Sequence, residues 1–152
     1  MKQNITQNKT FAHVKSEAKL ARQAVIIEAA ERVFAVKAFN EVSIRDIARE
    51  AGISHASIYR YFPDQQSLFI EAFLRGAGEI TATLEKLIEN AKTPDIMKVT
   101  DAYVTYLMDN DQYFRMMTHF MLDGALSAEK IEKLNAAERR IFDQFDRMFQ
   151  KM

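Results

Sequence analysis

The side chains best suited to specific polar chemistry are concentrated between residues 43 and 60. They combine hydroxyls, guanidinium groups, an imidazole and a phenol, the donors that proteins direct at phosphates and base edges: Ser43, Arg45, His55, Ser57, Tyr59 and Arg60. The rest of the chain offers no set of groups typical of catalysis. It has no cysteine, only three widely spaced histidines and no glycine-rich phosphate loop. We therefore expect a binding protein rather than an enzyme, with no metal and no cofactor.

Two short helices joined by a tight turn are needed to position these side chains. Ser43 and Asp46 have the spacing of a capping box, which predicts the start of the first helix. Gly52 predicts its end, because a residue without a Cβ readily adopts the left-handed conformation. Ser54 is a suitable cap for the second helix. Apolar residues at helical spacing predict one buried face: Ile44, Ile47, Ala48, Ile58 and Phe62. The polar side chains then lie on the other face, as in a helix-turn-helix that reads the major groove of DNA.

Composition favours an all-α fold. The 152 residues include four glycines and two prolines, and 48% are hydrophobic. Net charge is zero, but residues 1–63 hold 10 Lys and Arg against 6 Asp and Glu, whereas the rest of the chain is acidic. This asymmetry fits one end that faces DNA and one that does not. No apolar run of membrane-spanning length occurs near the start, so we expect a cytoplasmic protein without a membrane contact.

Helical periodicity divides the chain into three regions. Residues 1–15 are polar and are predicted to be a disordered basic arm. Residues 16–63 are predicted to form a helix-turn-helix DNA-binding domain, with a first helix over residues 16–37. Residues 64–152 are predicted to form a helical regulatory domain, with helices over residues 64–90, 94–108, 112–122 and 127–152. Within the first of these, Gly76 and Gly78 indicate a bend or a close helix crossing.

The segment from Arg22 to Leu74 resembles the N-terminal domain of the TetR family of bacterial transcriptional regulators. The resemblance covers about a third of the chain and rests on these residues: Ile26-Ile27, Ala29-Ala30, Phe34, Phe39, Val42–Ala48, Ala51–Ser54, Ile58-Tyr59, Tyr61-Phe62 and Leu68. It implies a three-helix DNA-binding domain followed by an α-helical ligand-binding and dimerisation domain. It also implies a repressor, released from a palindromic operator on double-stranded DNA by a hydrophobic small-molecule effector.

The resemblance further implies roles for individual residues. Ser43 and Tyr59 match phosphate contacts. Base reading falls on Arg45, His55, Ala56 and Ser57, with Arg60 and Tyr61 alongside. Gln65 is included as a further DNA contact.

Four features depart from the family pattern. Ala38 and Ala56 stand where the family often has glycine, and Gln65 stands where it usually has a phosphate-binding lysine. Family members also continue for two more helices, which normally build the dimer interface. Either this chain is truncated or it pairs differently.

The acidic region contains two apolar sets with possible functions. A ligand pocket is predicted from aromatic and methionine side chains, which accept varied apolar ligands but also form ordinary cores: Tyr103, Tyr106, Leu107, Met117, His119, Phe120, Met121 and Phe142. A homodimer interface is predicted on the last helix at Ile141, Phe145, Met148 and Phe149, because this stripe is broad for packing on one side only. The alternative function is a helical protein-interaction module in which the helix-turn-helix is only architectural.

Overall fold

The computed structural model describes residues 10–122 and 126–152, and every regular element in these ranges is helical. The elements are α1 (Phe11–Phe34), the 3-10 turn η1 (Phe39–Glu41), α2 (Ile44–Glu50), α3 (His55–Ile58), α4 (Gln65–Glu89), α5 (Ile96–Asp109), α6 (Asp111–Leu122) and α7 (Ala128–Lys151). The all-α prediction is confirmed. None of the described helices is both long and apolar enough to cross a lipid bilayer.

Side-chain caps start the helices where the sequence predicts them. The Ser43 hydroxyl accepts the Asp46 N–H, and the Asp46 carboxylate accepts the Ser43 N–H, which completes the capping box. The side chains of Ser54, Asp64 and Ser127 cap α3, α4 and α7, each by accepting the backbone N–H of the residue three positions later. Each cap satisfies backbone donors that the first helical turn leaves without a partner.

The chain leaves α2 through Gly52, whose φ of 68° lies in the left-handed region that suits glycine. Among the described residues it is the only one with a positive φ. Ala38, which stands where the family often has glycine, therefore needs no left-handed backbone. Its carbonyl instead accepts the Glu41 N–H at 2.9 Å in the turn η1.

Three helix boundaries differ from the prediction. α1 begins at Phe11, because Thr10 caps it and the His13–Glu17 pair spans its first turns, so residues 11–15 of the predicted arm are helical. Residues 1–9 of that arm lie outside the described residues. α5 is capped by Asp95 and begins at Ile96, two residues after the predicted start at residue 94. α3 is a single turn, after which hydrogen bonds from Tyr61 and Phe62 to the Ile58 carbonyl carry the chain toward α4.

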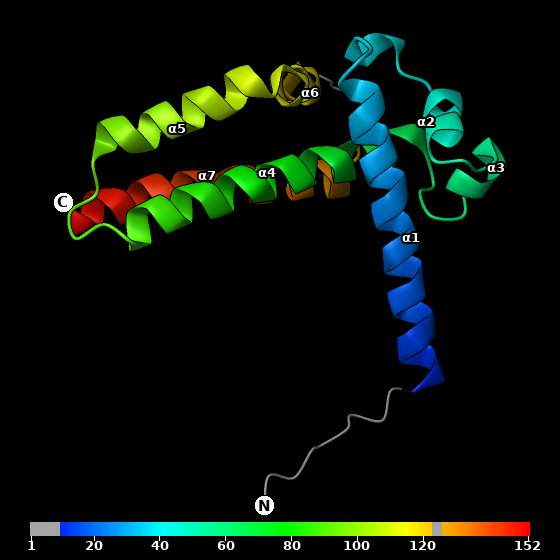
Figure 1. The fold of residues 1–152 in the computed structure, drawn as a ribbon, viewed down its shortest axis with the longest axis horizontal. Helices are drawn as coiled ribbons and strands as arrows, with labels where there is room; N and C mark the ends of the chain where they lie inside the picture. Colours follow the sequence, from blue (N-terminus) through cyan, green and yellow to red (C-terminus); the bar gives the residue numbers. More distant parts are fainter. Residues whose placement is uncertain (1–9, 123–125) are drawn as a thin grey trace, which may run out of the picture.

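The helices form two groups that share one core. α2 and α3 pack beside the C-terminal half of α1, while the N-terminal half of α1 projects away from the body (Figure 1). α4 and α7 lie side by side, and α5 and α6 pack against α4. Buried residues from both groups belong to one continuous cluster, so the two groups are mechanically joined.

α4 joins the two groups and crosses its neighbours closely at Gly76. A Cβ added to Gly76 would lie 2.9 Å from Cδ2 of Tyr113, and the Tyr106 hydroxyl donates to the Gly76 carbonyl at 2.9 Å. An added Cβ at Gly78 would meet nothing within 4 Å. The close crossing expected from this glycine pair is therefore made at Gly76 alone.

α7 uses much of its apolar stripe within its own protomer. Ile141 and Met148 are buried, and Phe145 is half-buried with its ring 6.0 Å from that of Tyr103. Phe149 is 56% exposed. The stripe is broad because α7 packs against α4 and also meets α5. Of the four predicted interface residues, only Phe149 remains largely exposed for contact with a second copy.

Candidate functional site

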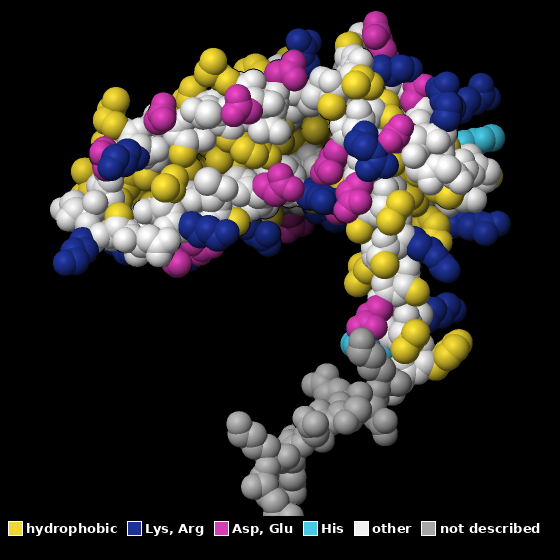
Figure 2. Space-filling model, viewed as in Figure 1, with side chains coloured by type: hydrophobic (Ala, Val, Ile, Leu, Met, Phe, Trp, Pro, Cys, Tyr) yellow, Lys and Arg dark blue, Asp and Glu magenta, His cyan; other side chains and the backbone are white. Residues whose placement is uncertain are grey.

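Burial of one face fixes the orientation of the α2–α3 unit. Ile47 and Ile58 are completely buried, and Ile44, Ala48 and Phe62 are nearly so. Because a helical residue opposite a buried one must face solvent, this packing turns the polar side chains outward. Arg45, His55, Ala56, Tyr59 and Arg60 are all exposed. Lys and Arg side chains gather with a histidine at this end of the molecule (Figure 2).

Asp46 is the electrostatic centre of this unit. Its carboxylate accepts hydrogen bonds from the Ser43 hydroxyl at 2.7 Å and from the Arg49 guanidinium at 2.6 Å, and it pairs with the Lys37 ammonium at 2.9 Å. The hydrogen bond from Lys37, followed by those from Ser43, holds the Asp46 pKa far below its usual range. Lys37 and Arg49 were not predicted as partners of Asp46 from the sequence, although the i, i+3 spacing of Arg49 could have indicated that pair.

Three of the predicted contact residues also have structural bonds. The Ser43 hydroxyl is engaged by Asp46, so a phosphate contact requires it to rotate. The half-buried Ser57 has its hydroxyl 2.8 Å from that of Ser54. Gln65 is exposed, and its amide donates to the Val42 carbonyl at 3.4 Å.

Tyr61 is turned partly inward. Its side chain is half-buried against the core, and its carbonyl accepts a hydrogen bond from Gln23 of α1 at 3.2 Å. This contact ties the end of the α3 region to α1. The structure therefore groups Arg45, His55, Ala56, Tyr59 and Arg60 as the most accessible of the predicted set.

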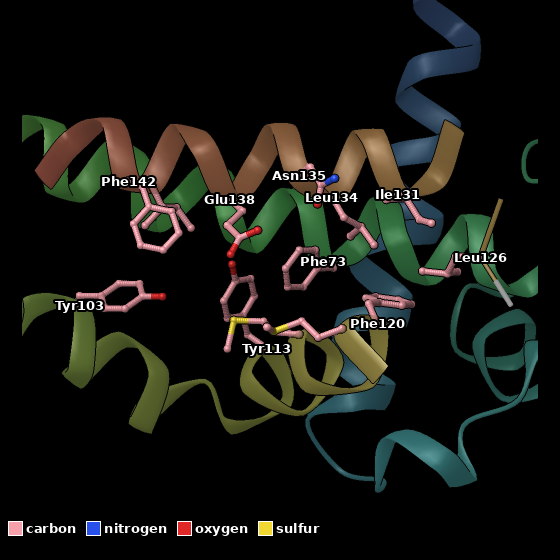
Figure 3. A pocket seen from close by; sticks show the side chains of 13 residues that line it. Phe73, Tyr103, Tyr113, Phe120, Leu126, Ile131, Leu134, Asn135, Glu138 and Phe142 are labelled. Carbon is pink, nitrogen blue, oxygen red and sulfur yellow. The ribbon is translucent and has the colours of Figure 1, made fainter. Parts of the chain in front are cut away.

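A second site is a cavity of about 510 Å³ among α4, α5, α6 and α7 (Figure 3). Of the eight predicted pocket residues, five line it: Tyr103, Met117, Phe120, Met121 and Phe142. The other lining residues are Phe73, Tyr113, Leu126, Ile131, Leu134, Asn135, Glu138 and Ile141.

Tyr106, Leu107 and His119 are not brought to this cavity. Tyr106 points at α4, where its hydroxyl bonds the Gly76 carbonyl and burial raises its pKa to about 12. Leu107 packs against the core. His119 is exposed and lines a separate shallow hollow on α6 with Phe114 and Thr118. Neighbouring residues on a helix face different sides. The density of aromatic and methionine residues in the sequence therefore did not show which of them line the cavity.

The polar lining contributed by α7 was not predicted from the sequence. Asn135 and Glu138 line the cavity together with Ile131 and Phe142. These four residues follow the spacing i, i+4, i+7 and i+11, which places them on one face of a helix. That spacing was the signal available, but the two polar members suggested solvent rather than a cavity wall.

Two phenols face the polar part of the cavity. Burial raises the pKa of both Tyr103 and Tyr113, and the nearby Glu138 charge shifts both in the same direction. Tyr113 is stacked on Phe73 with ring centroids 4.7 Å apart, and Phe120 meets Phe73 edge-on at 5.8 Å. The cavity is therefore an aromatic enclosure whose phenols remain neutral donors.

α4 connects the cavity with the α2–α3 end. Phe73 lines the cavity, and one turn earlier Phe69 meets Phe34 of α1 edge-on at 5.0 Å. At the start of α4, Asp64 pairs with Lys130 of α7 at 2.9 Å. A displacement of α4 or α7 at the cavity would thus act on the residues that lie next to α3.

Arg75 provides a second link between α4 and α1. Its guanidinium lies 3.4 Å from the carboxylates of Glu28 and Glu31. Burial raises the Glu31 pKa, and Arg75 opposes that rise. The orientation of α1 against α4 is therefore set by both apolar packing and charge.

Comparison with known proteins agrees with this arrangement. Residues 26–72 match the family model described as bacterial regulatory proteins, tetR family. The chain is similar to the HTH-type transcriptional regulator YfiR of Bacillus subtilis, at 26% identity over 143 residues that cover 91% of this chain and 68% of that protein. It is also similar to the HTH-type transcriptional regulator EthR of Mycolicibacterium smegmatis, at 39% identity over 49 residues, 32% of this chain and 23% of that protein.

Solved structures show the same fold. A TetR-family transcriptional regulator from Mesorhizobium loti superposes with a TM-score of 0.66 at 23% identity, covering 88% of this chain and 68% of that chain.

Proposed function

Since the chain belongs to the TetR family of bacterial regulatory proteins, we propose that this DNA-binding transcriptional regulator is a repressor released by a hydrophobic small molecule. In this proposal α3 enters the major groove of a palindromic operator, and the effector binds in the cavity among α4, α5, α6 and α7. The observation that carries it is the α2–α3 unit, whose apolar face is buried while its polar and basic face is exposed.

The exposed face suits DNA for chemical reasons. Arg45 can donate two hydrogen bonds to a guanine edge, and the methyl group of Ala56 can contact a thymine methyl. Tyr59 and Arg60 can donate to phosphates, which position a protein without reading sequence. A purely architectural helix-turn-helix has no need for this set on its open face. The protein-interaction module therefore stays the weaker candidate.

Release is proposed to act through α4. A ligand that separates the Phe73 ring from the rings of Tyr113 or Phe120 is proposed to displace α4, α6 or both, because these rings pack directly between the two helices. α4 continues to Asp64 and Gln65, which lie next to the α3 region. An effector lowers DNA affinity only if it binds the released arrangement of the helices more tightly than the DNA-bound arrangement. The ring contacts at Phe73 supply such a difference.

A homodimer is the proposed form on DNA. One helix-turn-helix makes few contacts, and such readers generally pair over two half-sites. Large apolar side chains remain exposed on α6 and α7, among them Met121, Leu122 and Phe149. These offer part of a self-complementary surface for a two-fold pair.

Fluorescence anisotropy with labelled DNA tests the proposal. We expect binding that weakens steeply as salt rises, since phosphate contacts release counterions. An apolar ligand panel should include compounds that release the DNA while the protein stays folded. Absence of DNA binding at low salt, with a binding protein partner instead, would favour the interaction module.

A further inference from the structure

The charged lining of the cavity is of one sign, negative. Among the described residues that line it, Glu138 is the only charged one. Its carboxyl group points from α7 toward the hydroxyl end of the Tyr113 side chain (Figure 3). Within the described part of the chain no ion pair engages Glu138, whereas Lys130 and Lys133 of the same helix are paired with Asp64 and Glu71. The Glu138 carboxylate is thus available to a ligand.

Glu138 is an exposed residue, and the cavity that it lines is rich in aromatic rings. They come from four helices and are Phe73, Tyr103, Tyr113, Phe120 and Phe142. The face of an aromatic ring carries partial negative charge and attracts cations. The phenols of Tyr103 and Tyr113 stay neutral, because burial raises the pKa of both. The rings and the carboxylate therefore both favour a positively charged ligand.

The same groups disfavour other ligands. An apolar ligand that covers Glu138 removes the carboxylate from water without replacing its hydrogen bonds, which costs free energy. A ligand with its own carboxylate would bring two like charges together in a cavity whose described lining holds no cation. A protonated amine or a quaternary ammonium group instead gains a charge-assisted contact.

We propose that this cavity selects lipophilic cations: molecules with an apolar, ring-containing body and an amine or ammonium group placed against Glu138. The inference deepens the proposed function, on which it rests for the claim that the cavity is the effector site. It assigns to Glu138 the discrimination between cationic and anionic ligands. The aromatic rings hold the body of the ligand.

Calorimetric titration of the full chain tests this with three probes that share one carbon frame. They are ω-phenyloctylamine, ω-phenyloctanol and ω-phenyloctanoate, which are cationic, neutral and anionic at neutral pH. We expect the amine to bind tightest and the carboxylate weakest. Glu138→Gln should weaken amine binding about tenfold, the loss expected for one contact to a charged group. It should leave binding of the alcohol nearly unchanged and improve binding of the carboxylate.

Glu132→Gln is the matched control, because Glu132 is an exposed residue of the same helix outside the cavity lining. It should keep the wild-type order of affinities. If the carboxylate probe binds as well as the amine, or if Glu138→Gln leaves their ratio unchanged, the cation class is wrong while the cavity remains a ligand site and the proposed function stands. If none of the three probes binds, the cation class and the effector role of the cavity are both wrong.

Discussion

Arg45 and Tyr59 are exposed on the same unit but are expected to act differently on DNA. An arginine that bonds a base edge discriminates between sequences by about 1–3 kcal/mol. Arg45→Ala should therefore change the preferred sequence, measured by sequencing random fragments that the purified protein enriches. Arg139→Ala, an exposed arginine on α7, is the control and should keep the wild-type preference. Unchanged affinity and preference in Arg45→Ala would show that the assigned docking is wrong.

Tyr59→Phe should weaken binding to all sequences about equally, because a phosphate contact carries no sequence information. The Tyr59 side chain is 49% exposed, so removal of its hydroxyl leaves the core intact. Anisotropy titrations against a preferred and a scrambled duplex would measure the effect. A loss confined to the preferred duplex would instead place Tyr59 on a base.

Asp46 should make the stability of the α2–α3 unit sensitive to acid. Its pKa in the folded protein is lowered by Lys37 and Ser43, so the carboxylate stabilises the fold at pH values above the unfolded pKa. That contribution is lost as the pH falls below about 4 toward the folded pKa. Asp46→Asn should be less stable at neutral pH and should show a shallower decline in acid. Urea unfolding followed by circular dichroism at several pH values measures this.

Asp143→Asn is the matched control, because Asp143 is an exposed aspartate. Asp143→Asn should reproduce the wild-type dependence on pH. If Asp46→Asn does so as well, the contacts of Asp46 do not contribute to acid stability.

At the scale of elements, Gly76 and Gly78 predict opposite effects of the same substitution. Gly76→Ala puts a methyl group 2.9 Å from the buried ring of Tyr113, which is held by its stack on Phe73. Overpacking of this kind costs about 1–3 kcal/mol. Gly78→Ala meets open space and should stabilise α4 by about 0.5–1 kcal/mol, because alanine is the better helix former. Thermal unfolding of both variants compares them, and equal shifts would contradict the close crossing.

Helix starts were the most predictable part of the fold, because caps are local. Ser43, Ser54, Asp64 and Ser127 begin helices in the structure as their spacing predicts. The early start of α1 was missed because residues 11–15 have no apolar periodicity to mark a helix. Thr10 was the available signal.

The cavity and the role of α7 were less predictable, because both depend on packing between distant elements. Five of the predicted pocket residues line the cavity, but Asn135 and Glu138 were missed because a polar residue on a helix usually faces water. The stripe on α7 was assigned to a second copy, whereas Ile141 and Met148 pack inside the protomer. A single sequence does not reveal which partner covers an apolar face.

At the scale of the whole molecule, the protein is predicted to be a homodimer. Phe149→Asp tests the pairing better than a substitution at Phe145, because Phe149 is exposed whereas Phe145 packs against Tyr103 within the protomer. Sedimentation velocity at micromolar concentration should give a dimer for the wild type and a shift toward monomer for Phe149→Asp, with unchanged helix content. Arg139→Ala again serves as the surface control. A wild type that sediments as a monomer at every concentration would refute the pairing.

The central claim is that the α2–α3 unit reads specific DNA sequences. Sequencing of random duplexes enriched by the purified protein at moderate salt tests it most directly. We predict an enriched palindrome whose half-sites are centred about one helical turn, or a multiple of it, apart. Recovered duplexes that match the input pool, with no sequence enriched, would contradict the claim.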